Sequence, residues 1–217
     1  MTSIPALSKA PFPDAPAALE EACVAGPGDV AAMLLFALSR RREGDDRPVL
    51  MAAPRAWFIE HGRPYGPGLP DIAFVLTPTA TPAEALWVLE QGLRSGAVSL
   101  ALGAVDGASL TQTRRLGFAA TQGEATGLLI PRTLDGLSAA SRRWRIATAP
   151  SAVDPDDPRA PGPVRLIADL VRARAERPGA WMLEQDDETH RLRLADRLAD
   201  FGPPPIAGTG AASGLAA

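Results

Sequence analysis

The sequence has very little cysteine, histidine or lysine: one cysteine (Cys23), two histidines (His61 and His190) and one lysine (Lys9) in 217 residues. A single cysteine excludes an intramolecular disulfide framework and a multi-cysteine zinc site. Two histidines leave little material for a histidine-rich metal centre. Arginines supply the other 21 basic residues, and the net charge of −3 argues against a global grip on a polyanion, while a local basic patch remains open.

Long apolar runs are also missing. The run Val30–Leu38 is far too short to span a bilayer. The first residues hold early prolines and no apolar segment of the kind found in signal peptides. Because 46% of the 217 residues are hydrophobic, the chain can bury one sizeable core. These features predict a cytoplasmic protein without membrane contact.

Strands and helices alternate as far as Pro131. The predicted strands span residues 17–25, 48–54, 72–77, 97–105 and 126–130. The predicted helices span residues 29–42, 81–96 and 109–122, and a short helix with a stiff loop is expected over residues 55–70. Strand–helix alternation with short links predicts an α/β fold with a mainly parallel sheet and helices on both faces.

The pattern changes after Pro131. Residues 164–174 and 180–184 flank Arg177–Gly179, which is typical of a hairpin turn, and residues 192–194 alternate like one more strand. This part predicts a C-terminal antiparallel meander. We expect a flexible N-terminal arm over residues 1–16, a single domain over 17–197 and a disordered tail over 198–217.

A glycine-containing loop follows the first predicted strand, where a nucleotide-binding protein would have its P-loop. The P-loop pattern needs a lysine and a hydroxyl residue after its second glycine. Counting from Gly26, those positions hold Ala32 and Met33. Asp29 is a natural N-cap that would occupy the free amides of the helix and repel phosphate. The segment with Gly26, Gly28 and Asp29 therefore predicts a degenerate site that does not hydrolyse ATP.

The chain resembles the ImuA family, which is also labelled SulA-like. The likeness covers about residues 17–195 and is carried by an ordered series of short segments rather than by one motif. The segments are residues 25–32, 47–55, 61–69 (HGRPYGPGL), 86–97 (LWVLEQGLRSGA), 114–116, 141–145 and 177–181. The resemblance implies a RecA-like core with a degenerate P-loop, no catalytic residues, no cofactor and no metal.

The resemblance also implies a role and partners. The family acts beside ImuB, an inactive relative of Y-family polymerases, and indirectly with an error-prone replicative-type polymerase subunit. The expected function is therefore a non-catalytic accessory role in SOS-controlled translesion synthesis and mutagenesis, through contact with RecA and ImuB. An SOS division inhibitor that binds the tubulin-like division protein is the alternative, and an unrecognised α/β enzyme is a third class.

One compact basic and aromatic cluster is present, formed by Arg142, Arg143, Trp144 and Arg145. It is the interaction candidate, either for an acidic partner surface or for a weak, salt-sensitive contact with single-stranded DNA. The competing interpretation is a helix-to-strand junction with a buried tryptophan and solvated arginines, which is the commoner situation.

Five further residues could carry chemistry, and each also has a structural interpretation. Asp106 stands where a RecA-like fold keeps a metal-binding carboxylate, but Asp106-Gly107 is typical of a turn. Glu84 fits a capping position and Glu90 a solvated helix face. His61 is expected in loop structure, and Cys23 in a buried strand as a small apolar residue.

The remaining candidates lie near the C-terminal end of the sequence. His190 is expected in a polar turn, and residues 186–188 (DDE) in a hairpin loop. The region after Arg197 is apolar without periodicity, and is either a docking arm or an inert tail.

Overall fold

The computed structural model describes residues 5–64, 69, 72–154, 156–157, 159–186 and 191–195. Its elements in chain order are β1 (Leu19–Val24), the 3-10 turn η1 (Pro27–Asp29), α1 (Val30–Ser39), β2 (Val49–Pro54), α2 (Arg55–His61), β3 (Phe74–Thr79), α3 (Pro82–Ser95), β4 (Leu100–Gly103), α4 (Leu110–Gln122), β5 (Thr126–Leu129), β6 (Arg142–Ala149), β7 (Arg165–Ala173), β8 (Gly179–Gln185) and β9 (Leu192–Leu194).

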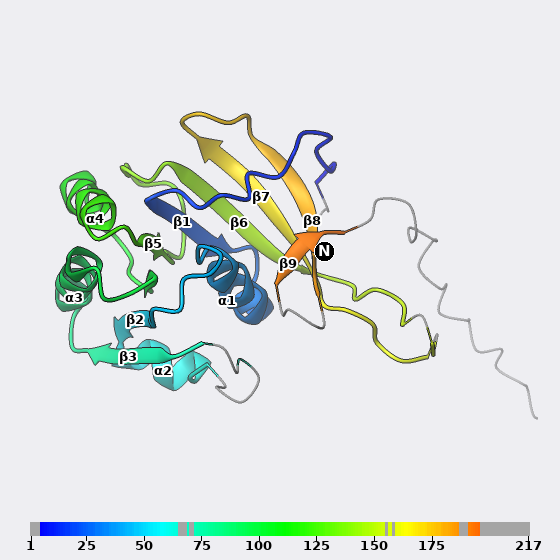
Figure 1. The fold of residues 1–217 in the computed structure, drawn as a ribbon, viewed down its shortest axis with the longest axis horizontal. Helices are drawn as coiled ribbons and strands as arrows, with labels where there is room; N and C mark the ends of the chain where they lie inside the picture. The colour runs from blue at the N-terminus through cyan, green and yellow to red at the C-terminus, as the bar shows by residue number, and fades with distance from the viewer. Residues whose placement is uncertain are drawn as a thin grey trace, which may run out of the picture.

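The strands form one nine-stranded sheet in the order β3-β2-β4-β5-β1-β6-β7-β8-β9. Pairing is parallel from β3 to β6 and antiparallel from β6 to β9. The predicted α/β fold is therefore confirmed as a mostly parallel sheet with a C-terminal antiparallel part. In Figure 1 the antiparallel strands extend the sheet beyond the region covered by α3 and α4.

Helices cover both faces of the parallel part (Figure 1). On one face, α1 buries Met33 and Phe36 against alternate residues of the strands, and Trp57 and Phe58 of α2 pack at its margin. On the other face, α3 and α4 bury a separate apolar cluster that includes Leu89. Because successive strand side chains point to opposite faces, the apolar runs of β2 and β4 supply both cores.

The caps of α3 follow from its local sequence. The Thr81 side chain accepts a hydrogen bond from the Glu84 backbone N–H at 3.2 Å, and Pro82 occupies the first helical position. Gly96 ends the helix with a left-handed φ of 67°. A Ser109–Gln112 capping box starts α4 in the same way. Local sequence is therefore sufficient to place both helices.

Two expectations, the end of α1 and the flexible N-terminal arm, are wrong. α1 ends at Ser39 rather than at Arg42, because the Arg40 side chain turns into the interior and is fully buried. The N-terminal residues 5–16 are packed rather than free: Ser8 N–H donates to the Ala180 carbonyl at 2.7 Å, and Phe12 lies between Trp144 and Trp181. The expected tail, residues 198–217, lies outside the described residues.

None of the helices in the described part of the chain has the length and apolar character needed to cross a bilayer.

Candidate functional site

The loop after β1 joins the strand to α1 through the single turn η1. Gly26 is extended, with φ of −150° and ψ of 168°, and neither Gly26 nor Gly28 has a positive φ. The sequence predicts that the Asp29 side chain caps α1, and this prediction is wrong, because the side chain makes no capping hydrogen bond. Its Oδ1 instead accepts a hydrogen bond from the Thr148 N–H of β6 at 2.8 Å. The turn is thus fastened to the neighbouring strand.

The residues at the lysine and hydroxyl positions of the P-loop pattern face the core. Ala32 is 4% exposed and Met33 is 1% exposed, both in the apolar cluster beneath α1. A phosphate at the mouth of this helix would meet the Asp29 carboxylate and no cation from these two positions. The geometry here suits packing of α1 on the sheet.

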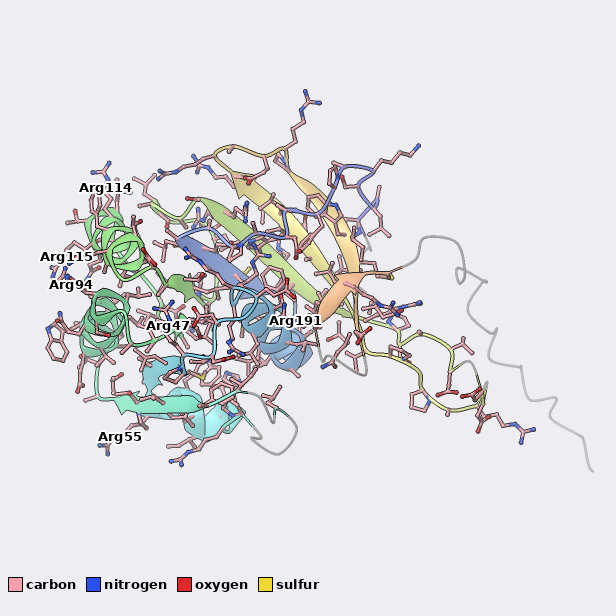
Figure 2. The ribbon with its side chains drawn as sticks, viewed as in Figure 1. Arg47, Arg55, Arg94, Arg114, Arg115 and Arg191 are labelled. Atoms are coloured by element: carbon pink, nitrogen blue, oxygen red, sulfur yellow. The ribbon has the colours of Figure 1, made fainter. Side chains whose placement is uncertain are left out.

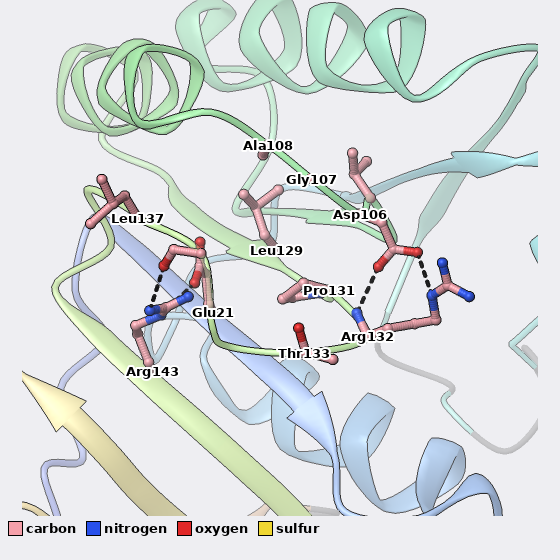
Figure 3. A pocket seen from close by; sticks show the side chains of 12 residues that line it. Glu21, Asp106, Gly107, Ala108, Leu129, Pro131, Arg132, Thr133, Leu137 and Arg143 are labelled. Carbon is pink, nitrogen blue, oxygen red and sulfur yellow. Dashed lines mark hydrogen bonds and ion pairs between the residues drawn. The ribbon is translucent and has the colours of Figure 1, made fainter.

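A cavity of about 460 Å³ opens at the carboxyl ends of β4 and β5 (Figure 3). Ligands of open α/β sheets bind in crevices at this edge. Leu129 and Glu21 line the cavity from the strands, and the segment 131–137 closes it from the other side, with Leu137 73% exposed. It is therefore the candidate pocket of the fold.

The charged groups of this cavity are paired with one another. Asp106 accepts a hydrogen bond from the Arg132 backbone N–H at 2.7 Å and forms an ion pair with Arg132 Nε at 2.8 Å. Glu21 accepts from Arg143 Nε at 2.7 Å and from the Ser138 hydroxyl, and Arg143 also donates to the Gly136 carbonyl at 2.9 Å (Figure 3). These pairs hold the 131–137 segment over the strands rather than leaving an acid or base free for catalysis.

A second ion-pair network, which is buried, lies on the α1 face of β1 and β6. Glu20 and Arg40 are both 0% exposed, and Arg40 donates to Glu20 Oε1 at 2.9 Å. Glu20 also accepts from Arg142 at 3.3 Å and, through Oε2, from the Trp144 indole N–H at 2.6 Å. Arg142 continues the network to Glu176. Buried charges require this degree of pairing.

Arg142 and Glu176 form the outer pair of this network, and their ionisation follows from their contacts. Burial alone would disfavour the charged form of Arg142, but hydrogen bonds and charge from Glu176 and Glu20 outweigh it and raise the pKa of the guanidinium. The hydrogen bond from Arg142 in turn lowers the pKa of Glu176 below its usual value. Both groups are therefore charged at neutral pH.

The cluster Arg142–Arg145 is not the surface that the sequence suggested. It is part of β6, so its side chains alternate between faces: Arg142 and Trp144 enter the α1 face, and Arg143 enters the cavity side. Trp144 is 0%, Arg142 9% and Arg143 7% exposed. The buried tryptophan of the competing interpretation is confirmed, but its solvated arginines are not. Only the Arg145 side chain is half exposed.

These features can be compared with known proteins. No family model matches the chain. The chain is 33% identical over 199 residues to Protein ImuA of Caulobacter vibrioides, in strains NA1000 / CB15N and ATCC 19089 / CIP 103742 / CB 15, with 85% of this chain and 79% of each relative covered. The chain belongs to the ImuA family. Among solved structures it is similar to SulA from Pseudomonas aeruginosa, with a TM-score of 0.41 and 24% identity, covering 54% of this chain and 98% of that one.

The remaining candidates of this ImuA-family chain have structural partners. Glu84 accepts from the Ala80 N–H at 2.7 Å in the expected capping role. Glu90, expected on a solvated face, is 5% exposed and paired with Arg94 and Arg115, because the two arginines reach it from α3 and α4. Asp106 lies before Gly107, whose φ of 69° confirms the turn.

His61 and Cys23 show no catalytic arrangement. His61 belongs to the last turn of α2 rather than to a loop, and its ring lies 4.8 Å from the Trp57 ring centroid. Cys23 is buried in β1, and this burial raises the pKa of its thiol, with Arg145 opposing the effect. Asp187, Glu188 and His190 lie outside the described residues. Within the described part of the chain, no three potential ligand side chains are grouped as a metal site requires.

Glu20 and Glu21 are the two residues that sequence reasoning missed. Both lie in a six-residue strand and are 0% and 4% exposed. Two adjacent carboxylates in a strand expected to be buried require two cationic partners, one for each face. The adjacent Arg142 and Arg143 of β6 supply them, and this match was the available signal.

Proposed function

We propose that this ImuA-family chain is a non-catalytic accessory factor in SOS-controlled, damage-induced mutagenesis and translesion synthesis. It acts through contact with a RecA-family recombinase and with an ImuB-like, inactive Y-family polymerase partner, and through the latter with an error-prone replicative-type polymerase subunit. Family membership supports this role, and the geometry of the loop after β1 supports its non-catalytic character.

The loop after β1 is the observation that carries the non-catalytic part of the proposal. We infer that the core is RecA-like with a degenerate P-loop: a parallel strand, a glycine-containing turn and a helix stand at the position of a nucleotide site. Ala32 and Met33 are buried there, and the Asp29 carboxylate is held by the Thr148 N–H. A nucleotide would have to displace this hydrogen bond without gaining a cationic partner from either position.

Titration of the full chain with a fluorescent ATP analogue in magnesium buffer tests the first half of the proposal. We expect no saturable binding at micromolar concentrations. The double change Ala32→Lys with Met33→Thr, which would introduce the lysine and hydroxyl of the P-loop pattern, is not a usable control, because both side chains pack in the core. Saturable micromolar binding by the unaltered chain, or phosphate release above the blank, would contradict the non-catalytic role.

Co-purification from cells with damaged DNA tests the second half. A tagged full-length chain is expected to recover the recombinase and the polymerase-like partner, with recovery rising after damage. Recovery of the tubulin-like division protein, with neither of these two, would favour the division-inhibitor function instead.

Direct contact with single-stranded DNA is proposed to be weak and secondary. Three members of the Arg142–Arg145 cluster are buried, so they offer few cations to phosphates. Binding of labelled oligothymidine at two salt concentrations measures this: neutralised phosphates release counterions, so the slope against salt counts the contacts. We expect a shallow slope, and a steep one would contradict the proposal.

A further inference from the structure

The outer face of α3 and α4 carries two exposed aromatic rings. Trp87 of α3 is 60% exposed and Phe118 of α4 is 76% exposed. A shallow hollow of about 100 Å³ lies between the two helices beside Trp87. Large aromatic side chains are usually well covered, so two on neighbouring helices form an uncommon surface. Their helices already bury other residues in the core, so these rings are not needed for packing.

Three arginines lie on the same two helices. Arg94, Arg114 and Arg115 project from the outer side of α3 and α4 in Figure 2. We call Trp87, Phe118 and these arginines the α3–α4 face. Arg115 and Arg114 are three and four residues from Phe118, so helical spacing places them near it, and Arg115 lines the hollow together with Trp87.

One buried carboxylate orients two of the arginines. Glu90 Oε1 accepts a hydrogen bond from Arg94 at 2.6 Å, and Glu90 Oε2 forms an ion pair with Arg115 at 2.7 Å, while the two arginine side chains remain 44% and 61% exposed. Because a single carboxylate is shared by two guanidinium groups, the face keeps a net positive charge. The two arginines are also ordered before any partner arrives, which lowers the entropic cost of binding.

We propose that the α3–α4 face is a docking site for an acidic segment of a partner protein that carries an aromatic or large aliphatic anchor. The anchor would pack on Trp87 and in the hollow beside it, and carboxylates of the segment would reach the arginines. Tryptophan and arginine are the residues that most often carry interface energy. The positive charge of the face, on a chain whose net charge is −3, is the complementarity that selects an acidic partner.

The shape of the face favours a protein over a nucleic acid. Sites for single strands combine a basic groove that follows the backbone with rings on which successive bases stack. Here the two exposed rings lie on two neighbouring helices, and the hollow of about 100 Å³ is too small to hold a strand. A short peptide segment with one anchor fits this arrangement.

Fluorescence anisotropy with the full chain tests the surface directly. The probe is a short fluorescein-labelled peptide in which Asp and Glu alternate with Leu and Phe. A second peptide has Ser in place of Leu and Phe, and labelled oligothymidine is the third probe. We expect the first peptide to bind, and the serine peptide to bind at least about tenfold more weakly, the loss of about 1.4 kcal/mol.

Trp87→Ala and Arg114→Glu should each weaken the first peptide by about tenfold, a size typical of interface anchors. Neither residue is in the Glu90 pair, so thermal melts should stay unchanged. Ile59→Ala, which also removes an exposed apolar side chain, and Arg55→Glu, which makes the same charge reversal, are the controls on the exposed surface of α2. The proposal is overturned if the controls weaken binding equally, if the peptide does not bind, or if oligothymidine binds more tightly and loses binding in the α3–α4 variants.

The identity of the biological partner rests on the proposed function, and the same variants separate the two proposals. If the recombinase and polymerase-like partner co-purify equally with unaltered and variant chains, the accessory function stands and this docking site is wrong. If neither co-purifies but the variants lose the acidic peptide, the docking site stands and the proposed partners are wrong.

Discussion

Two groups of arginine and aromatic side chains occupy opposite environments in this chain. Arg142, Arg143 and Trp144 are consecutive and lie inside the protein, paired with Glu20 and Glu21. The α3–α4 face is assembled from residues that are far apart in sequence, and it lies on the surface. A strand distributes neighbours between two faces, whereas two packed helices bring distant residues together. Compactness in sequence is therefore a poor guide to a shared surface.

Removing the central carboxylate of the buried group should give the largest effect. Glu20→Ala leaves Arg40 and Arg142 without a shared partner and the Trp144 N–H without an acceptor. We expect a loss of roughly 3–5 kcal/mol of unfolding free energy, the cost of breaking a buried pair. Urea denaturation followed by circular dichroism measures it. A variant within about 1 kcal/mol of the original protein would show that the network is accessible to water.

Truncating the ring of the same group should cost nearly as much. Trp144 is fully buried against Phe12 and Phe36, at 5.7 and 5.1 Å between ring centroids. Trp144→Ala is expected to lose about 3–5 kcal/mol by creating a cavity. Trp144→Phe, which keeps most of the volume but loses the indole N–H, is the control, and its stability should lie between those of Trp144→Ala and the original protein. An unchanged melting temperature for Trp144→Ala would contradict the buried position.

The outer pair of the buried network should appear in the pH dependence of stability. The pKa of Glu176 is lowered by the hydrogen bond from Arg142, so in the acidic range the unfolded chain binds this proton more readily than the folded one. The stabilisation is complete above the ordinary glutamate pKa of about 4.3 and is lost as pH falls towards the lowered value. Glu176→Gln should flatten this part of the stability profile, measured by thermal melts at stepped pH. An identical profile in the variant would show that the pair does not couple to folding.

The smallest effect on stability is expected from the exposed group. Trp87→Ala should change the free energy of unfolding by no more than about 0.5 kcal/mol, as is usual for surface positions. Comparison with Trp144→Ala under the same denaturant conditions sharpens the contrast between the two aromatic positions. A loss above about 2 kcal/mol would mean that the Trp87 ring is part of the core and not a free surface.

The alternation of strands and helices, the caps of α3 and α4 and the antiparallel C-terminal part could all be predicted from local patterns. Each depends on residues close in sequence, such as Thr81, Pro82 and Glu84 at one helix start. The packing of residues 5–16 could not be predicted, because proline-rich segments have no periodicity and Phe12 finds its partners on β6 and β8. The cavity at the carboxyl ends of β4 and β5 was not predicted, because its closure by residues 131–137 depends on pairings with Glu21 and Asp106 that are distant in sequence.

The sequence by itself determined that Ala32 and Met33 stand where the P-loop pattern, counted from Gly26, has its lysine and hydroxyl residue, and that the chain resembles the ImuA family. Tertiary structure decided which charges are free. Whether an arginine meets water or a carboxylate depends on the strand beside it, and β1 is more than a hundred residues away from β6 along the chain. On opposite faces of the sheet, Glu20 and Glu21 pair with the buried arginines of β6. Glu90 is a single carboxylate shared by two arginines, so the α3–α4 face keeps a net positive charge.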